Sequence, residues 1–119
     1  MKTSYRNVTA YVTKDGSEIR ELLHPGVQKA GRQSLAEAII QPGSRTRLHY
    51  HQTTEELYHV TQGFGSMILG QQTIAIEPGD TVLIPPKMPH CVEAYGTVPL
   101  HILCCCHPAY SHEDTELME

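Results

Sequence analysis

Short apolar runs alternate with turn residues along almost the whole chain. Many of these runs place an apolar residue at every second position, which is typical of half-buried β-strands. The segments between them contain Gly, Pro and Asp, which favour tight turns. We predict ten strands: Val8–Val12, Ile19–Leu23, Ser34–Ile40, Arg47–His51, Glu56–Thr61, Gly65–Leu69, Gln72–Ile76, Thr81–Ile84, His90–Ala94 and Leu100–Cys106. Many short, evenly spaced strands predict an all-β sandwich or barrel.

Two local features refine this pattern. The runs Ser66–Leu69 and Thr73–Ile76 flank Gly70-Gln71-Gln72, which predicts a tight β-hairpin. The tail after the last strand, residues 107–119, is polar and acidic. Ser111 or Asp114 suits the N-cap of a short helix in this tail.

Length and charge limit the classes of function. The chain has 119 residues, which predicts one domain with a core barrel at about residues 34–106 and additions at 8–23 and 107–119. A net charge of -4 and the absence of Trp argue against a nucleic-acid partner. No run of 18 apolar residues predicts a membrane span, and the N-terminus has no apolar signal core. We therefore expect a cytoplasmic protein.

The four cysteines do not have the spacing of a disulfide framework. They are Cys91, Cys104, Cys105 and Cys106. Three consecutive cysteines on a strand point to alternating faces, so they cannot form a zinc knuckle. We expect reduced thiols that pack as small apolar side chains.

The pair His49 and His51 carries the candidate chemistry. Side chains two positions apart leave the same face of a strand, so both imidazoles can point into a barrel. A carboxylate follows at Glu55 or Glu56, and strand parity leaves open which of the two faces inward. His90 follows a strand and a Pro-rich corner. Three His and one carboxylate suit a divalent transition metal.

These residues resemble the two motifs of the cupin superfamily. Gly43, His49, His51, Glu56 and Gly63 fill the pattern G-x5-H-x-H-x4-E-x6-G. In the second motif, G-x5-P-x-G-x2-H-x3-N, the residues Gly79, Pro85 and His90 match, whereas Lys87 replaces Gly and Ala94 replaces Asn. The spacer between Gly63 and Gly79 has 15 residues, as is common in small single-domain microbial cupins. The resemblance extends from about Leu35 to Cys106.

The resemblance implies a double-stranded β-helix, or jelly-roll, barrel. It favours Glu56 over Glu55 and implies a metal site formed by His49, His51, Glu56 and His90. The bound ion would be one divalent transition metal per chain, which is Fe, Mn, Ni, Zn or Cu.

Parity within such a barrel assigns further residues to its interior. Arg47 shares the face of the His pair and is expected to point inward, where it would anchor an anionic substrate group. Tyr58 follows Glu56 inward and could donate to a substrate oxygen or pack in the core. Ile102 and Cys104 are expected to face in, with Ala36 and Ala38 on the opposite wall. The remaining histidines, which lack paired spacing, are expected outside the site: His24, His59, His101, His107 and His112.

Fold alone does not determine the reaction, because one scaffold supports many activities. We expect a metal-dependent enzyme that acts on a small, anionic or oxygen-rich molecule, as a dioxygenase or a sugar isomerase or lyase. Glu56, Arg47 and Tyr58 are the expected catalytic residues. The alternative is a non-catalytic metabolite- or sugar-binding cupin with a regulatory role. A homodimer is expected from the resemblance to other single-domain cupins.

Overall fold

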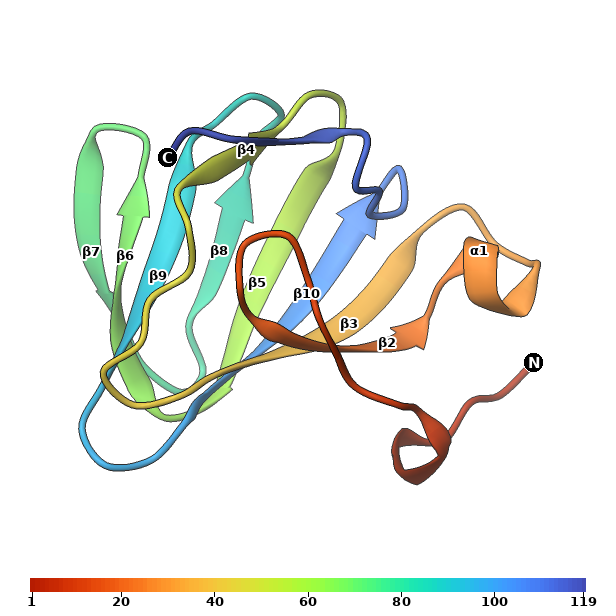
Figure 1. Ribbon diagram of the computed structural model, residues 1–119, viewed down its shortest axis with the longest axis horizontal. Coiled ribbons are helices and arrows are strands. Elements are labelled where there is room, and N and C mark those ends of the chain that lie inside the picture. The colour runs from red at the N-terminus through yellow and green to blue at the C-terminus, as the bar shows by residue number, and fades with distance from the viewer.

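The protein folds into two antiparallel β-sheets that face each other around a common interior (Figure 1). The computed structural model describes residues 1–119. The strands are β1 (Tyr11–Val12), β2 (Glu18–Leu23), β3 (Ser34–Ile40), β4 (His49–His51), β5 (Glu55–Gln62), β6 (Phe64–Leu69), β7 (Gln72–Ile76), β8 (Thr81–Ile84), β9 (His90–Tyr95), β10 (Leu100–His107) and β11 (Thr115–Leu117). A 3₁₀ turn, η1 (Tyr5–Asn7), and one short helix, α1 (Pro25–Gln28), complete the elements.

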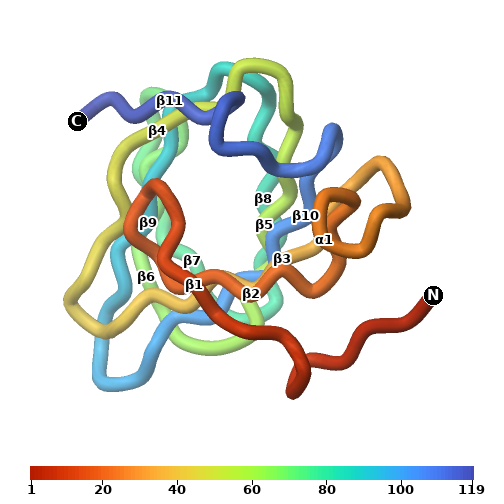
Figure 2. The backbone as a smooth tube through the Cα atoms, turned by 45° about the vertical axis from the view of Figure 1, so that its right-hand side comes forward, coloured from red at the N-terminus to blue at the C-terminus, as the bar shows by residue number.

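The sheet order is that of a jelly-roll barrel. One sheet has the order β1-β2-β3-β10-β5-β8, and the other has the order β11-β4-β9-β6-β7. Figure 2 shows the strands arranged around a central axis. The predicted all-β barrel is therefore confirmed. Each of the ten predicted strands also has a counterpart, including the hairpin of β6 and β7.

Alternation along β3 and β10 explains how the core forms. These strands pair in register, and every second residue of each is buried. Ile102 pairs with Ala38 and Cys104 pairs with Ala36, and all four side chains face the interior, as predicted. β3 and β10 are neighbours in one sheet, so the two alanines share a wall with Ile102 and Cys104 and do not lie on the opposite wall that the sequence had suggested.

The chain segments on either side of the barrel motifs take part in the two sheets. β1 and β2 form a hairpin, and β2 extends the larger sheet beyond β3. β11 pairs with β4, so the C-terminal segment lies beside the strand that carries the His pair (Figure 2). The helix suggested at Ser111 or Asp114 is not present. Ser111 Oγ accepts from Asp114 N in a turn, and the chain then continues as β11.

Helical structure is minimal. The longest helix, α1, has four residues, and no helix is long and apolar enough to cross a bilayer. His24 caps this helix, because its Nδ1 accepts a hydrogen bond from Gly26 N.

Candidate metal centre

Three histidines converge inside the barrel with equivalent orientations. Arg47 O, Thr115 Oγ1 and Met88 O lie 2.7 to 2.9 Å from the Nδ1 atoms of His49, His51 and His90, respectively. Each Nδ1 therefore donates, and each Nε2 keeps a lone pair. The three rings offer ligand atoms that lie within 4.8 Å of one another, and all three residues are buried. This group could hold a metal ion.

Strand pairing brings the third ring to the first two. His90 lies directly opposite His49 in the β4–β9 ladder, and the ring centroids are 4.2 Å apart. The corner before β9 is fixed by Lys87, whose N–H donates to His51 O at 2.6 Å. Lys87 has a φ of 68°, in the left-handed region that favours glycine. The second cupin motif has glycine at this position because glycine adopts a positive φ without strain.

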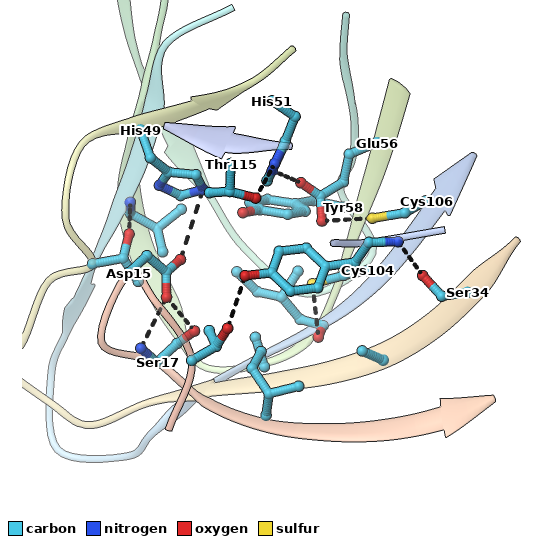
Figure 3. Close-up of a pocket in the computed structure, with 18 of the residues that line it drawn as sticks. Asp15, Ser17, Ser34, His49, His51, Glu56, Tyr58, Cys104, Cys106 and Thr115 are labelled. Carbon is cyan, nitrogen blue, oxygen red and sulfur yellow. Dashed lines mark hydrogen bonds and ion pairs between the residues drawn. The ribbon is translucent and has the colours of Figure 1, made fainter. Parts of the chain in front are cut away.

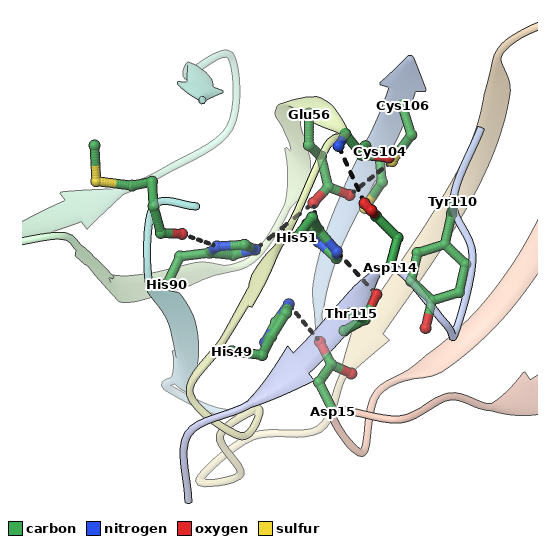
Figure 4. A network of polar contacts seen from close by, with 12 residues as sticks. Asp15, His49, His51, Glu56, His90, Cys104, Cys106, Tyr110, Asp114 and Thr115 are labelled. Atoms are coloured by element: carbon green, nitrogen blue, oxygen red, sulfur yellow. Dashed lines mark hydrogen bonds and ion pairs between the residues drawn. The ribbon is translucent and has the colours of Figure 1, made fainter. Parts of the chain in front are cut away.

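Glu56 completes the cluster from β5. It is buried, and its Oε1 lies 3.1 Å from His51 Nε2 and 3.6 Å from His90 Nε2 (Figure 4). Glu55 is exposed. The structure thus answers the question that parity left open, because Glu56 and not Glu55 faces the histidines.

The polar atoms of this cluster require a cation. Nδ1 of His51 already donates to Thr115, so a neutral His51 presents a lone pair at Nε2 to the lone pairs of Glu56. His90 Nε2 is fully buried and has no hydrogen-bond partner. A metal ion or proton between these atoms removes the conflict, and three imidazoles with one carboxylate suit a divalent transition metal.

Electrostatics keep the carboxylate charged and His49 neutral. Burial alone would raise the pKa of Glu56, but the adjacent imidazoles of His51 and His90 more than offset this effect and lower the pKa to about 2. Burial, together with the adjacent His90 imidazole, lowers the pKa of His49 to about 4. A carboxylate and neutral imidazole are the forms that bind metals.

The cluster lies at the wall of a cavity in the barrel (Figure 3). Apolar residues such as Ile19, Ala36 and Ile102 line part of it. Two further carboxylates, Asp15 and Glu21, come from the turn after β1 and from β2. The metal cluster therefore faces a space that could admit a small molecule.

Asp15 lies closest to the histidines among these carboxylates. Its Oδ1 accepts from both N and Oγ of Ser17, at 2.9 and 2.7 Å. Its Oδ2 lies 3.8 Å from His49 Nε2. The backbone of the turn is fixed as well, since Arg47 N donates to Asp15 O at 2.8 Å. One carboxylate oxygen is thus held rigidly beside the cluster without a hydrogen bond of its own.

Two thiols and a phenol also face the interior. Cys106 Sγ donates to Glu56 Oε2 at 3.2 Å, and burial raises the pKa of the Cys104 and Cys106 thiols. Tyr58 is buried, and burial raises its pKa well above the ordinary value. These groups are uncharged near neutral pH. The four cysteines are unpaired, and all except half-buried Cys105 are buried, as expected for reduced thiols.

The comparison with protein families decides the identity of this barrel. Residues 36–106 match the model of the Cupin domain. The chain belongs to the cupin family. An uncharacterized protein of Methanocaldococcus jannaschii, MJ1618, is 55% identical to this cupin over all 119 residues, which cover 95% of the relative.

Solved cupin structures share the fold at low sequence identity. A predicted oxalate decarboxylase from Thermotoga maritima has a TM-score of 0.79 and 21% identity, and the match covers 91% of this cupin and 99% of that chain. The Streptomyces nucleoside dehydratase Pac13 has a TM-score of 0.80 and 13% identity, with 100% and 91% covered.

One predicted orientation in the cupin is wrong. Arg47 is exposed and donates to Glu119 O at 2.6 Å, so it does not line the cavity. An inward-facing Arg47 requires a regular strand from residue 47, but β4 begins only at His49. Thr46 is buried instead, because its N and Oγ1 both bond to the backbone of Val92. Arg47 therefore does not anchor an anionic substrate group in the cavity, contrary to the prediction.

Two other expectations for the cupin interior hold. Tyr58, Ile102 and Cys104 face the cavity. The five histidines without paired spacing lie outside the metal cluster, and His101, for example, faces Glu37 at 3.4 Å. Sequence reasoning missed Asp15, Glu21 and Thr115, because they lie outside the two motifs and approach the site only through strand pairing.

Proposed function

We propose that this cupin is a metal-dependent enzyme that acts on a small, oxygen-rich molecule inside the barrel. The observation that carries the proposal is the convergence of three buried imidazoles and the Glu56 carboxylate, of which His49, His51 and Glu56 line a cavity. His49, His51, His90 and Glu56 would hold one divalent transition metal. The metal would act as a Lewis acid that polarises a carbonyl or hydroxyl oxygen of the substrate.

The residues around the metal cluster support proton transfer. Asp15 Oδ2 is free to accept a proton from a substrate hydroxyl or from a carbon next to a polarised carbonyl. Ser17 holds the other oxygen and so fixes the direction of Oδ2. Tyr58 keeps its proton near neutral pH and would donate a hydrogen bond to a substrate oxygen. Glu56 would ligate the metal and exchange a proton with the substrate.

This arrangement favours isomerase or lyase chemistry. Both reaction types need a metal-polarised oxygen and a nearby base, and neither needs an oxidant. The names of two proteins with this fold, a nucleoside dehydratase and a predicted oxalate decarboxylase, also denote lyase reactions. The dioxygenase expectation has a separate support, since three His and one carboxylate also suit iron(II).

A non-catalytic metabolite- or sugar-binding cupin with a regulatory role is the alternative. In that case the metal would only orient the ligand, and Asp15 would be a hydrogen-bond acceptor without a proton-transfer role.

The test combines two readouts on protein loaded with Fe²⁺ under anaerobic conditions or with Mn²⁺, Ni²⁺ or Zn²⁺. A panel of sugars, hydroxy acids and diketones is incubated in D₂O. Isomerase or lyase chemistry predicts deuterium in the product or recovered substrate, detected by mass spectrometry, without oxygen uptake. Oxygen uptake with the iron form identifies a dioxygenase. Binding of a panel member with neither signal would support the regulatory alternative.

Asp15→Asn separates the base from a structural residue. The asparagine keeps the shape and can still accept from Ser17, so metal content should stay near one per chain while deuterium exchange falls about 100-fold or more. The control is Ser17→Ala, which leaves the carboxylate in place and should reduce exchange less.

A homodimer and a cytoplasmic location complete the proposal. Neighbouring strands of the larger sheet place Leu35, Cys105, Leu57 and Leu83 in one row on its outer face. The three leucines are 38 to 51% exposed, so association of two copies through this face would bury apolar surface. Light scattering at micromolar concentration would give twice the 13.3 kDa chain mass, and Leu57→Lys would give the monomer. Four unpaired cysteines suit a reducing compartment.

A further inference from the structure

The charged side chains that line the cavity are all acidic, which indicates the kind of ligand that it can bind. Three carboxylates line the cavity: Asp15, Glu21 and Glu56. The chain has nine Lys and Arg residues, and none of them lines it. The two cations nearest in sequence to Asp15 and His49 point away, because Lys14 Nζ donates to Thr115 O and Arg47 donates to Glu119 O. No cationic side chain is therefore available to pair with an anionic ligand.

Two of these carboxylates have an oxygen with no hydrogen-bond donor. Asp15 is 9% exposed, and its Oδ2 forms no hydrogen bond, whereas Oδ1 accepts two. Glu21 Oε1 accepts from Tyr11 OH at 3.0 Å, but its Oε2 is buried without a partner. A buried acceptor such as Glu21 Oε2 costs about 1–3 kcal/mol without a donor. Asp15 Oδ2 also has no donor, so both oxygens are suited to receive donors from a ligand.

The two carboxylates come from one hairpin. Asp15 belongs to the turn between β1 and β2, and Glu21 lies on β2 on the same face as buried Ile19. Glu21 pairs with Ala36 of β3, whose small side chain also lines the cavity. The hairpin therefore presents acceptors from its turn and from its second strand to one ligand.

The remaining lining is uncharged and amphipathic. Hydroxyl groups of Thr13, Ser17 and Tyr110 and apolar groups such as Ile19 and Ile40 share the wall. A sugar or polyol has hydroxyl donors on its edges and C–H groups on its faces, which matches this mixture.

We propose that the β1–β2 hairpin forms a substrate-binding wall that selects uncharged, polyhydroxylated ligands, with Asp15 Oδ2 and Glu21 Oε2 accepting from ligand hydroxyls. The wall disfavours carboxylate and phosphate ligands through repulsion. This inference rests on the proposed function, because it concerns the same cavity. It replaces the anionic substrate expected from the sequence by a neutral one.

The test uses matched neutral and acidic probes on protein that contains one Zn²⁺ per chain. The probes are five pairs: glucose and gluconate, galactose and galactonate, mannose and mannonate, ribose and ribonate, and xylose and xylonate. Isothermal titration calorimetry measures each dissociation constant with no free metal present. At least one neutral sugar is expected to bind about tenfold or more tightly than its acid.

Charge-neutralising variants then assign this preference to the wall. Sugar binding should weaken in Asp15→Asn, in Glu21→Gln and in the double variant. In the double variant, the ratio of the acid's dissociation constant to that of its sugar should fall towards one. Glu18→Gln on the same strand is the control, since Glu18 is 43% exposed and pairs with Arg20 outside the cavity. It removes the same charge from the chain and should leave the preference unchanged.

Three results would overturn the inference. In the first, the wild type binds the acids at least as tightly as their sugars. In the second, folded Asp15 and Glu21 variants keep the wild-type preference for the sugar. In the third, no sugar binds. The wild-type comparison decides the matter even if a variant fails to fold. Failure of the proposed function looks different: sugars would bind, but no substrate would be converted. Conversion of an anionic substrate would instead support the enzyme and contradict this wall.

Discussion

His51 Nδ1 lies 2.9 Å from Thr115 Oγ1, so β11 near the C-terminus orients a candidate metal ligand on β4. Thr115 Oγ1 donates its own proton to Ser111 O at 2.9 Å, which leaves its lone pairs to accept from His51. The hydroxyl thereby fixes the tautomer with a free Nε2. Hydrogen bonds of this kind typically contribute 10- to 100-fold to metal affinity.

Thr115→Val should therefore weaken binding of Zn²⁺ about 10-fold or more, because valine keeps the shape and removes the acceptor. Competition with a chelator of known affinity measures the change. Thr115→Ser retains the hydroxyl and should bind within about threefold of the wild type. Equal affinity in the valine variant and the wild type would show that the hydroxyl does not position His51.

Metal-free protein should lose stability as the pH falls. The pKa of His49 is about 4 in the folded chain, against an ordinary value of 6.5. The unfolded chain therefore binds more protons between these values, so the free energy of unfolding falls as the pH drops from about 6.5 to 4, by roughly 3 kcal/mol in total. Glu56, whose pKa is lowered to about 2, adds a further loss below pH 4.5.

Urea unfolding in the presence of a chelator, from pH 7 to pH 4.5, measures this dependence. His49→Gln should flatten the upper part of the curve, whereas His59→Gln, at an exposed hydrogen bond to Thr81, should not. A wild-type stability that stays constant or rises on acidification would contradict the lowered pKa of His49.

Lys87→Gly should stabilise the protein. A non-glycine residue in the left-handed region is strained by about 1–2 kcal/mol, and part of the gain is offset by the greater freedom of glycine in the unfolded chain. We expect a net increase of about 0.5–1 kcal/mol in the free energy of unfolding. Lys87→Ala removes the same amine but keeps the strain, so it should bring no comparable gain. A glycine variant no more stable than the alanine variant would refute the conformational explanation.

The sequence predicts the barrel well because its strands carry local signals. Alternating apolar residues predict β3 and β10. The fixed spacings of the two motifs identify the candidate ligands His49, His51, Glu56 and His90. These signals depend on neighbours a few residues away. They predict where strands run and which face of a regular strand is buried.

The rest of the site depends on contacts between distant segments. Thr115 approaches His51 only because β11 pairs with β4, and Asp15 approaches His49 only because the first hairpin closes one wall of the cavity. Neither residue has a local signal of its role. The error for Arg47 has a related origin, since hydrogen bonds of Thr46 to Val92 on another strand set the orientation of an irregular segment.

Glu56 is the predicted fourth ligand, and Glu55 is its matched control. Glu56→Gln should lower the metal content from about one ion per chain to well below half after dialysis against a weak chelator, because removal of a charged ligand costs several kcal/mol. Glu55→Gln should keep the wild-type content, since Glu55 is exposed. Equal retention by both variants, measured by atomic emission, would exclude Glu56 as a ligand.

X-ray absorption spectroscopy of the Zn²⁺-loaded protein tests the metal centre most directly. The account predicts one ion per chain with three imidazole nitrogens and at least one oxygen at about 2.0–2.2 Å, and no sulfur. A sulfur shell at about 2.3 Å would place the ion on cysteines such as Cys106 instead. That result, or a wild-type protein that binds no metal at all, would contradict the centre formed by His49, His51, His90 and Glu56.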